Sequence, residues 1–259
     1  MRPMGFEVAA EAYDRFMGRY SRLLSPQLAD LAGIVDGIVA GQRVLDVGCG
    51  PGALTAELVS RLGPGSVTAV DPSESFVAAA LQRNPGVTVL QASAAGMPFA
   101  DGTFDATLAQ LVVHFMPDPV AGLSEMRRVT RSGGVVAACV WDFGAGRGPL
   151  GPFWQAARDL DPMVEAEAHL PGTREGHLGE LFASAGLRDV TPAELWVSLE
   201  HPTFEAWWEP FTEGVGPAGS YVASLPPEGQ AALRERCREL LPEPPFAIDA
   251  RAWAARGTS

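Results

Sequence analysis

The sequence contains no lysine, since all 19 basic residues are arginines. This absence excludes enzymes that form a Schiff base through a lysine, and it excludes the phosphate-binding P-loop, which needs one. Cysteine is also scarce: Cys49, Cys139 and Cys237 lie far apart and form no C-x-x-C pair. Three such cysteines predict neither a disulfide framework nor a zinc site. We therefore expect a cytoplasmic protein that holds no metal.

Long apolar runs and basic regions are missing as well. No stretch approaches the ~18 uninterrupted apolar residues of a membrane span, and Glu7, Glu11 and Asp14 stand where an export signal would be apolar. The 31 acidic residues outnumber the 19 basic ones and give a net charge of −12, which repels phosphate backbones and anionic lipids. We expect no nucleic-acid partner and no membrane partner, and the sequence leaves the oligomeric state open.

The apolar pattern alternates between strands and helices. Helical spacing over residues 6–39 predicts two helices that separate near Ser25-Pro26. Buried strands are predicted further on, at 43–48, 66–71, 87–91, 104–111 and 133–141. Helices are predicted between them, at 52–63, 73–83 and 118–130. Because right-handed crossovers place helices on both faces of a parallel sheet, this order predicts a doubly wound α/β fold.

The pattern loosens after Trp141. We predict two more helices at 152–160 and 175–187, a strand at 188–198, a mostly helical stretch at 203–241 and a last strand at 246–255. The two late strands could pair as a widely spaced hairpin.

The stretch VLDVGCGPG, residues 44–52, sets glycines directly after the first predicted strand. Gly48, Gly50 and Ala53 fit the G-x-G-x-x-G/A loop of dinucleotide sites. A pyrophosphate, however, needs backbone donors, and Pro51 removes one while Asp46 adds a negative charge. That carboxylate would instead attract a cofactor that carries an ammonium group and a sulfonium, such as S-adenosylmethionine.

VLDVGCGPG resembles the glycine-rich motif of class I S-adenosylmethionine-dependent methyltransferases, in which a hydrophobic strand and an acid precede G-x-G-x-G. Asp46, Gly48, Gly50 and Gly52 fill the four places. The resemblance is to small-molecule enzymes similar to the methyltransferases of ubiquinone and menaquinone biosynthesis. It implies a seven-stranded, mostly parallel, Rossmann-like sheet with an antiparallel seventh strand, N-terminal helices and a helical insertion before the last strand.

Two further stretches resemble the family around the nucleoside. VTAVDPS implies that Asp71 binds both ribose hydroxyls and that Pro72 packs near the adenine, although Asp before Pro also makes a good helix N-cap. QASAAGMPFADGTFD departs from the family pattern, because Ser93 stands where an Asp commonly contacts the adenine amino group. The backbone N–H of Ala94 could still reach the ring.

Two others resemble the part of the family that surrounds the methionine portion of the cofactor. FDATLAQLVVHFMPDP implies that Gln110 faces the cofactor ammonium, the alternative being a strand end that faces solvent. AYDRFMGRYS looks like the N-terminal helix that closes over the cofactor, so Tyr13 and Arg19 are candidates to hold its carboxylate and Met17 to cover it. Tyr13 could equally be a core residue, given its helical spacing.

The methyl acceptor is the least determined part of the prediction. His114 is the candidate catalytic base for a hydroxyl acceptor, with turnover rising through a pH near ~6.5, but a buried packing role competes. Aromatic residues in the late helical region could wall an acceptor pocket or simply form a core, namely Phe153, Trp154, Trp207, Trp208 and Phe211.

We treat residues 1–259 as one methyltransferase domain, with an N-terminal helical cap at 1–40, a cofactor-binding core at 41–141 and acceptor or lid segments at 142–175 and 199–245. The predicted reaction is in-line transfer of the methyl group of S-adenosylmethionine to an O, N or C atom of a small, largely apolar acceptor, with S-adenosylhomocysteine as product. An NAD(P)-dependent oxidoreductase and a non-catalytic cofactor-binding protein of the same fold remain the alternatives.

Overall fold

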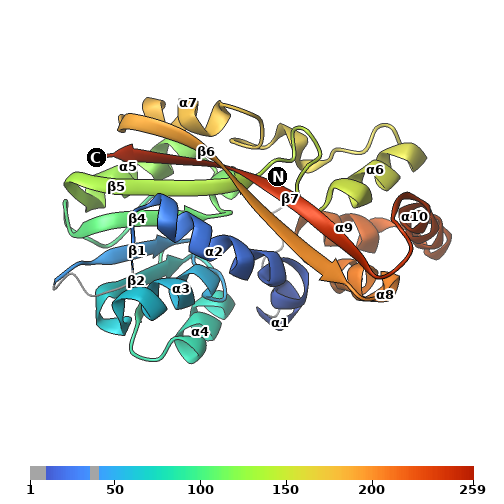
Figure 1. The fold of residues 1–259 in the computed structure, drawn as a ribbon, viewed down its shortest axis with the longest axis horizontal. Helices are drawn as coiled ribbons and strands as arrows, with labels where there is room; N and C mark the ends of the chain where they lie inside the picture. The colour runs from blue at the N-terminus through green and yellow to red at the C-terminus, as the bar shows by residue number, and fades with distance from the viewer. Residues whose placement is uncertain (1–9, 36–40) are drawn as a thin grey trace.

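The computed structural model describes residues 10–35 and 41–259. Its centre is one seven-stranded sheet in the order β3-β2-β1-β4-β5-β7-β6 (Figure 1). The strands are β1 Val44–Val47, β2 Val67–Asp71, β3 Thr88–Gln91, β4 Phe104–Gln110, β5 Thr130–Trp141, β6 Arg188–His201 and β7 Phe246–Thr258. Strands β1 to β5 pair in parallel and β7 is antiparallel to both of its neighbours. The predicted doubly wound α/β fold and its late hairpin are confirmed.

Helices cover both faces of the sheet. The helices and short helical turns are α1 Ala10–Tyr13, η1 Asp14–Gly18, α2 Arg19–Leu31, α3 Ala53–Leu62, η2 Pro64–Ser66, α4 Glu74–Arg83, η3 Val113–Phe115, α5 Pro119–Val129, α6 Gly151–Leu160, η4 Glu167–His169, α7 His177–Ser184, α8 Phe204–Trp208, η5 Glu209–Glu213, α9 Gly216–Ser224 and α10 Pro227–Leu240. Successive strand residues alternate between two cores, as Leu108 and Ala109 do. No helix in the described ranges is long and apolar enough to cross a membrane.

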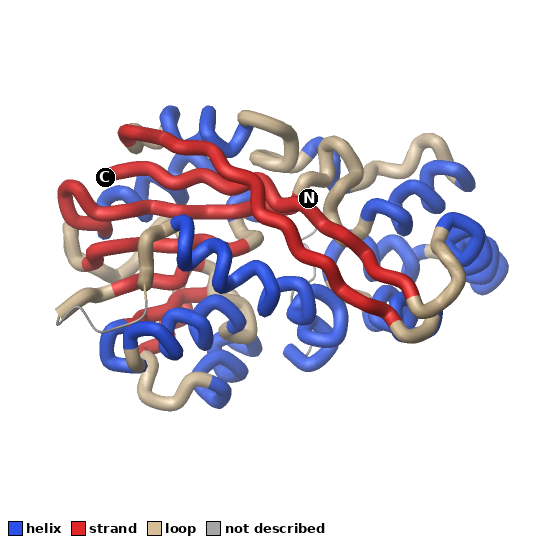
Figure 2. Tube along the Cα trace, in the orientation of Figure 1, coloured by secondary structure: helices blue, strands red, loops and turns tan. Residues whose placement is uncertain are grey.

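The last two strands are much longer than the rest and form an arm. Residues 252–258 of β7 pair with both β5 and β6, whereas residues 246–251 pair with β6 alone. The arm therefore leaves the sheet and reaches the lobe of α8, α9 and α10 (Figure 2). This lobe is the predicted helical insertion, and the arm is what holds it beside the carboxyl ends of the parallel strands.

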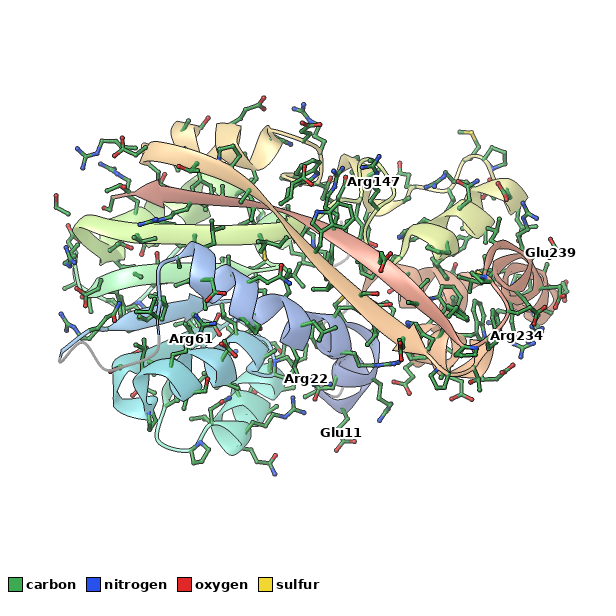
Figure 3. The ribbon with its side chains drawn as sticks, viewed as in Figure 1. Glu11, Arg22, Arg61, Arg147, Arg234 and Glu239 are labelled. Atoms are coloured by element: carbon green, nitrogen blue, oxygen red, sulfur yellow. The ribbon has the colours of Figure 1, made fainter. Side chains whose placement is uncertain are left out.

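The N-terminal segment is one continuous helical run and not two helices, so the predicted break at Ser25-Pro26 is wrong. Pro26 lies inside α2 and costs one backbone hydrogen bond. Packing outweighs that cost because Leu24 and Leu28 are fully buried. Arg61 of α3 also donates to the Pro26 carbonyl at 3.1 Å (Figure 3). Helix α2 ends at Leu31 and residues 32–35 are not helical, so the predicted helix extends too far there. The outer parts of the predicted span, 6–9 and 36–39, lie outside the described residues.

A buried ion pair fixes the loop that follows β5. Nη2 of Arg251, on β7, lies 2.7 Å from Oδ2 of Asp142, and their side chains are 9% and 1% exposed. Asp142 Oδ1 in turn accepts from the backbone N–H of Ala145 at 3.0 Å. The pair therefore ties the loop at 142–150 to the start of the arm.

Replacing Asp142 with alanine should destabilise the protein strongly, because it leaves the Arg251 guanidinium buried without its main partner. We expect a loss of about 3 kcal/mol or more in the free energy of unfolding, measured by denaturant titration. Glu194 is the matched control, since it contacts the same guanidinium at 3.4 Å but is 45% exposed. Glu194→Ala should cost less than about 1 kcal/mol, and equal losses would contradict this account.

Candidate active site

The turn after β1 brings the glycine motif close to the segment that follows β4. Gly48 has a φ of +69°, and a Cβ there would lie 2.5 Å from Cγ2 of Val112. Gly50 has open space around it but a φ of +52°, which side chains rarely adopt. The first position therefore needs glycine for a close approach, and the second needs it for backbone conformation.

Asp71 closes this turn from the end of β2. Its Oδ2 accepts from the Gly50 N–H at 2.9 Å, and its Oδ1 accepts from the Ser73 N–H at 2.8 Å. Burial raises the pKa of the Asp71 carboxyl group. The N-cap of α4 is Ser73, whose hydroxyl accepts from Phe76. The alternative in which Asp71 caps that helix is therefore wrong.

Buried polar atoms near the glycine turn have no partner within the described residues. Asp46 accepts from the Thr55 hydroxyl through Oδ2 at 2.6 Å, but its Oδ1 is unpaired. Burial raises the pKa of Asp46 to about 7. Gln110 donates to the Ser21 carbonyl at 3.1 Å, while its Oε1 is unpaired. Gln110 is buried, so the alternative of a solvent-facing strand end is wrong. Unpaired acceptors of this kind fit a cofactor that brings an ammonium group.

The residues predicted around the nucleoside gather at neighbouring strand ends. Pro72 directly follows Asp71, and its carbonyl accepts from Gln91 at 2.9 Å. Ser93 lies two residues beyond β3 and is exposed, with its hydroxyl accepting from the Ala95 N–H at 3.3 Å. Ala94 beside it is half-buried. The fold thus brings these positions together at one edge, and their roles stay predictions.

The N-terminal helix supplies two of its three predicted residues to the site. The Tyr13 ring meets that of Phe76 edge-on at 5.4 Å, and burial raises the pKa of Tyr13 to about 12. Met17 is buried, and its sulfur accepts from the Trp141 indole at 3.2 Å. Arg19 instead donates to the carbonyls of Glu200 and Ala206, both at 3.3 Å. The structure therefore uses Arg19 to join helix, arm and α8, and does not bring it to the glycine turn.

An apolar cavity, here called the acceptor pocket, lies under this helix. It is lined by residues from the N-terminal helix, the ends of β4 and β5, η4 and α9: Tyr13, Phe16, Met17, Leu111, His114, Phe115, Trp141, Phe143, Leu150, Glu167, Val215, Gly216, Pro217 and Ala218. Val112, which contacts the glycine turn, lies between Leu111 and His114. The acceptor pocket is therefore next to the turn.

His114 and Glu167 are polar groups in this apolar setting. The His114 ring lies 3.9 Å from that of Phe115, its Nδ1 has no partner in the described chain, and burial lowers its pKa to about 3. A pKa this low does not fit the expected rise in turnover near pH 6.5, and the role of His114 stays a prediction. Glu167 Oε2 accepts from the Trp154 indole at 2.9 Å, and burial raises the pKa of Glu167 to about 7.

Sequence reasoning missed Glu167. The stretch VEAEAHL offers two glutamates, Glu165 and Glu167, both flanked by small or apolar residues, and only the fold buries the second. The aromatic residues of α6 and the lobe, by contrast, pack on one another, as Phe153 and Phe211 do at 4.5 Å. None of the five predicted as lid aromatics lines the acceptor pocket in the described part of the chain. They belong to the hydrophobic core that also includes Leu24 and Leu28.

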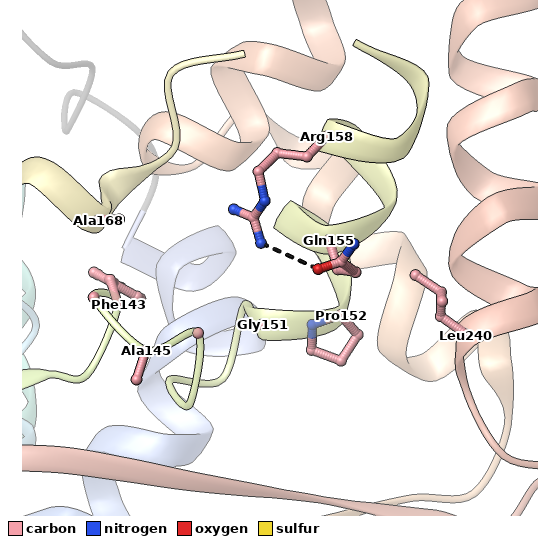
Figure 4. A pocket seen from close by; sticks show the side chains of 10 residues that line it. Phe143, Ala145, Gly151, Pro152, Gln155, Arg158, Ala168 and Leu240 are labelled. Atoms are coloured by element: carbon pink, nitrogen blue, oxygen red, sulfur yellow. Dashed lines mark hydrogen bonds between the residues drawn. The ribbon is translucent and has the colours of Figure 1, made fainter. Parts of the chain in front are cut away.

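A second cavity, the outer cleft, opens between the loop after β5, α6 and the end of α10 (Figure 4). It shares Phe143 with the acceptor pocket, so this ring separates the two spaces. Arg158 extends across the cleft and donates to the Gln155 side chain at 3.5 Å.

Comparison with known proteins agrees with this geometry. A family model for a methyltransferase domain matches residues 45–138. An uncharacterised methyltransferase of Mycobacterium sp. (strain KMS) is 32% identical over 203 residues, covering 75% of this chain and 79% of that protein. The chain belongs to the class I S-adenosylmethionine-dependent methyltransferases. Its cofactor is therefore S-adenosylmethionine, and the NAD-dependent alternative is not supported.

A further sequence relative and a solved structure are also similar to this methyltransferase. The 2-methyl-6-phytyl-1,4-hydroquinone methyltransferase 2 of rice is 33% identical over 150 residues, but this chain spans only 39% of its length. The structure of a phosphoethanolamine N-methyltransferase of Haemonchus contortus with S-adenosylhomocysteine has a TM-score of 0.57 at 17% identity, covering 96% of this chain and 59% of that one. The latter likeness shows the fold.

If Asp71 binds the ribose of the methyltransferase cofactor, Asp71→Ala should weaken S-adenosylhomocysteine binding far more than Ser93→Ala. Loss of two charge-assisted hydrogen bonds corresponds to about 100-fold or more, and loss of one neutral bond to about 5-fold. Calorimetric titration of both variants measures the difference, with thermal unfolding as a check on the fold. Equal affinities in the two variants would contradict the ribose assignment.

Proposed function

We propose that this protein transfers the methyl group of S-adenosylmethionine to a small, largely apolar acceptor held in the acceptor pocket. The observation that carries the proposal is the contact between Gly48 and Val112, which sets an apolar pocket directly beside the cofactor turn. Methyl transfer is an in-line displacement, so alignment of the acceptor and exclusion of water supply much of the rate. An apolar pocket walled by Tyr13, Met17 and Trp141 suits both needs.

Within that class, we propose a phenol or hydroquinone as acceptor. The rice relative is named for a hydroquinone with an apolar tail. The acceptor pocket matches such a compound, because its ring-lined wall suits an aromatic nucleus and His114 Nδ1 is free in the described chain to meet a hydroxyl. A net charge of −12 disfavours nucleic acid as acceptor. We place the reaction in the cytoplasm, supported by three buried cysteines that form no disulfide.

The site residues enter the proposal as follows. Asp46 and Gln110 would hold the cofactor ammonium, and Asp71 the ribose, with the turn at Gly48 and Gly50 giving the backbone shape that all of them need. Pro72, Ser93 and Ala94 would surround the adenine, and Tyr13 and Met17 would close over the methionine portion. His114, uncharged at neutral pH, would orient the acceptor.

Binding and turnover test the proposal in two steps. S-adenosylmethionine and S-adenosylhomocysteine should raise the melting temperature, since both bind only the folded state, and NAD should not. A panel of phenols, hydroquinones, aliphatic amines and thiols is then screened by release of S-adenosylhomocysteine. Turnover of phenolic compounds supports the proposal. Cofactor binding with no turnover on the whole panel would favour the non-catalytic alternative, and transfer to tRNA or protein alone would refute a small-molecule acceptor.

His114→Ala should lower kcat/KM for the phenolic acceptor about 10–100-fold, because a pocket hydrogen bond that orients the hydroxyl is lost. Cofactor affinity should stay within about 2-fold. His114 is already neutral above pH 4, so the shape of the pH–rate profile should not change. His169→Ala, which changes an exposed histidine at the end of η4, is the control and should behave as wild type. A profile that loses an inflection near pH 6.5 in His114→Ala would contradict a neutral role.

A further inference from the structure

Glu167 is a buried acid at the acceptor pocket. It begins the short turn η4, Glu167–His169, between α6 and α7, and only 4% of its surface is exposed. Glu165, two residues earlier in the same segment, is exposed. Burying a carboxyl group in an apolar pocket costs free energy unless the group is paired. The buried position of Glu167 therefore requires an explanation.

Glu167 has few partners to offset that cost. The hydrogen bond from the Trp154 indole N–H to Oε2, at 2.9 Å, is the one that the described residues give its side chain. The bond fixes one carboxyl oxygen from the α6 side. The second carboxyl oxygen, Oε1, accepts no hydrogen bond from the described residues, and Glu167 lines the acceptor pocket, where the acceptor would lie.

The other titratable groups that line the pocket are unsuited to take a proton. Tyr13 stays protonated, since burial raises its pKa to about 12. Burial lowers the pKa of His114 to about 3, so its ring is a poor proton acceptor for a phenol, whose free pKa is about 10. Burial raises the pKa of Glu167 to about 7, which brings it closer to that of the phenol and makes this carboxylate the better-matched base of the two.

We propose that Glu167 is the catalytic general base of the reaction. The acceptor O–H bond breaks, its proton forms a bond to a carboxylate oxygen of Glu167, and the electron pair stays on the acceptor oxygen, or on the conjugated ring carbon, as the nucleophile. S-adenosylmethionine supplies the methyl group when bound. The inference rests on the proposed function, because it requires an acceptor with a hydroxyl proton. The proposal gives the segment at 142–175 a chemical role in addition to lining the acceptor pocket.

Glu167→Gln is the decisive variant, because its amide oxygen can still accept from Trp154 but cannot take a proton. We expect kcat on a phenol from the panel to fall about 10²–10⁴-fold. In wild type, kcat should rise about tenfold per pH unit below 7 and level off above it, since only the ionised carboxylate acts as base. In the variant this rise should disappear. Glu165→Gln is the matched control and should keep both the rate and the profile.

A second readout does not depend on turnover. With S-adenosylhomocysteine bound, the carboxyl carbon resonance of Glu167, identified as the one missing from Glu167→Gln, should titrate near pH 7 and should shift when the phenol enters the pocket. Trp154→Phe removes the donor that stabilises the ionised carboxylate, so the inflection should move to higher pH while the plateau rate is largely kept. A residue that only packs against Trp154 would leave the inflection unchanged.

The outcomes separate the two proposals. If the wild type methylates no member of the panel, the proposed function fails. If the wild type methylates a phenol and Glu167→Gln, folded by thermal unfolding, retains its rate and its pH profile, only the role of Glu167 is overturned. Turnover restricted to acceptors that carry no hydroxyl proton would also overturn it.

Discussion

The close approach of the glycine turn to Val112 is the constraint on which the site depends. A Cβ at Gly48 would lie 2.5 Å from the Val112 side chain, so the turn after β1 and the segment after β4 can approach this closely only because residue 48 is glycine. One side of the contact is the cofactor turn, held by the Asp71 carboxylate through the Gly50 N–H. The other side is the start of the acceptor pocket at Leu111 and His114. Any side chain at Gly48 would push donor and acceptor sites apart.

Buried charge is the second feature that shapes the site. Burial raises the pKa of both Asp46 and Glu167 to about 7 and lowers that of His114 to about 3. Each of these groups is harder to ionise in the fold than in water, so the site is built at a cost in stability. Two of them keep an unpaired polar atom within the described chain, Asp46 Oδ1 and His114 Nδ1. Bound ligands that satisfy those atoms would recover part of that cost.

The long antiparallel arm connects this chemistry to the lobe. Residues 246–251 of β7 pair only with β6. The helices α8 and α9, which connect β6 to β7 at this end of the arm, share one hydrophobic core with the N-terminal helix. Arg251 joins the arm to Asp142, and Arg19 joins it to the N-terminal helix. The loop at 142–150, which carries Phe143, is thereby held by the ion pair between Asp142 and Arg251 and by the hydrogen bond from the Arg251 N–H to the Arg147 carbonyl at 2.8 Å.

Local physics in the sequence was enough to predict the strand order along the chain, the late hairpin and the cofactor turn. Gly48 and Gly50 need backbone conformations that other residues avoid, and the alternation of apolar runs reports which residues face a core. Contacts between distant segments decided the rest. Pro26 lies within a helix because Leu24 and Leu28 are buried by partners far along the chain, and Arg19 finds carbonyls some 180 residues away. Glu165 and Glu167 lie two residues apart in one short stretch, and burial beside Trp154 distinguishes the second from the first. Burial depends on the whole fold, so no local pattern could have shown which acid would have an altered pKa.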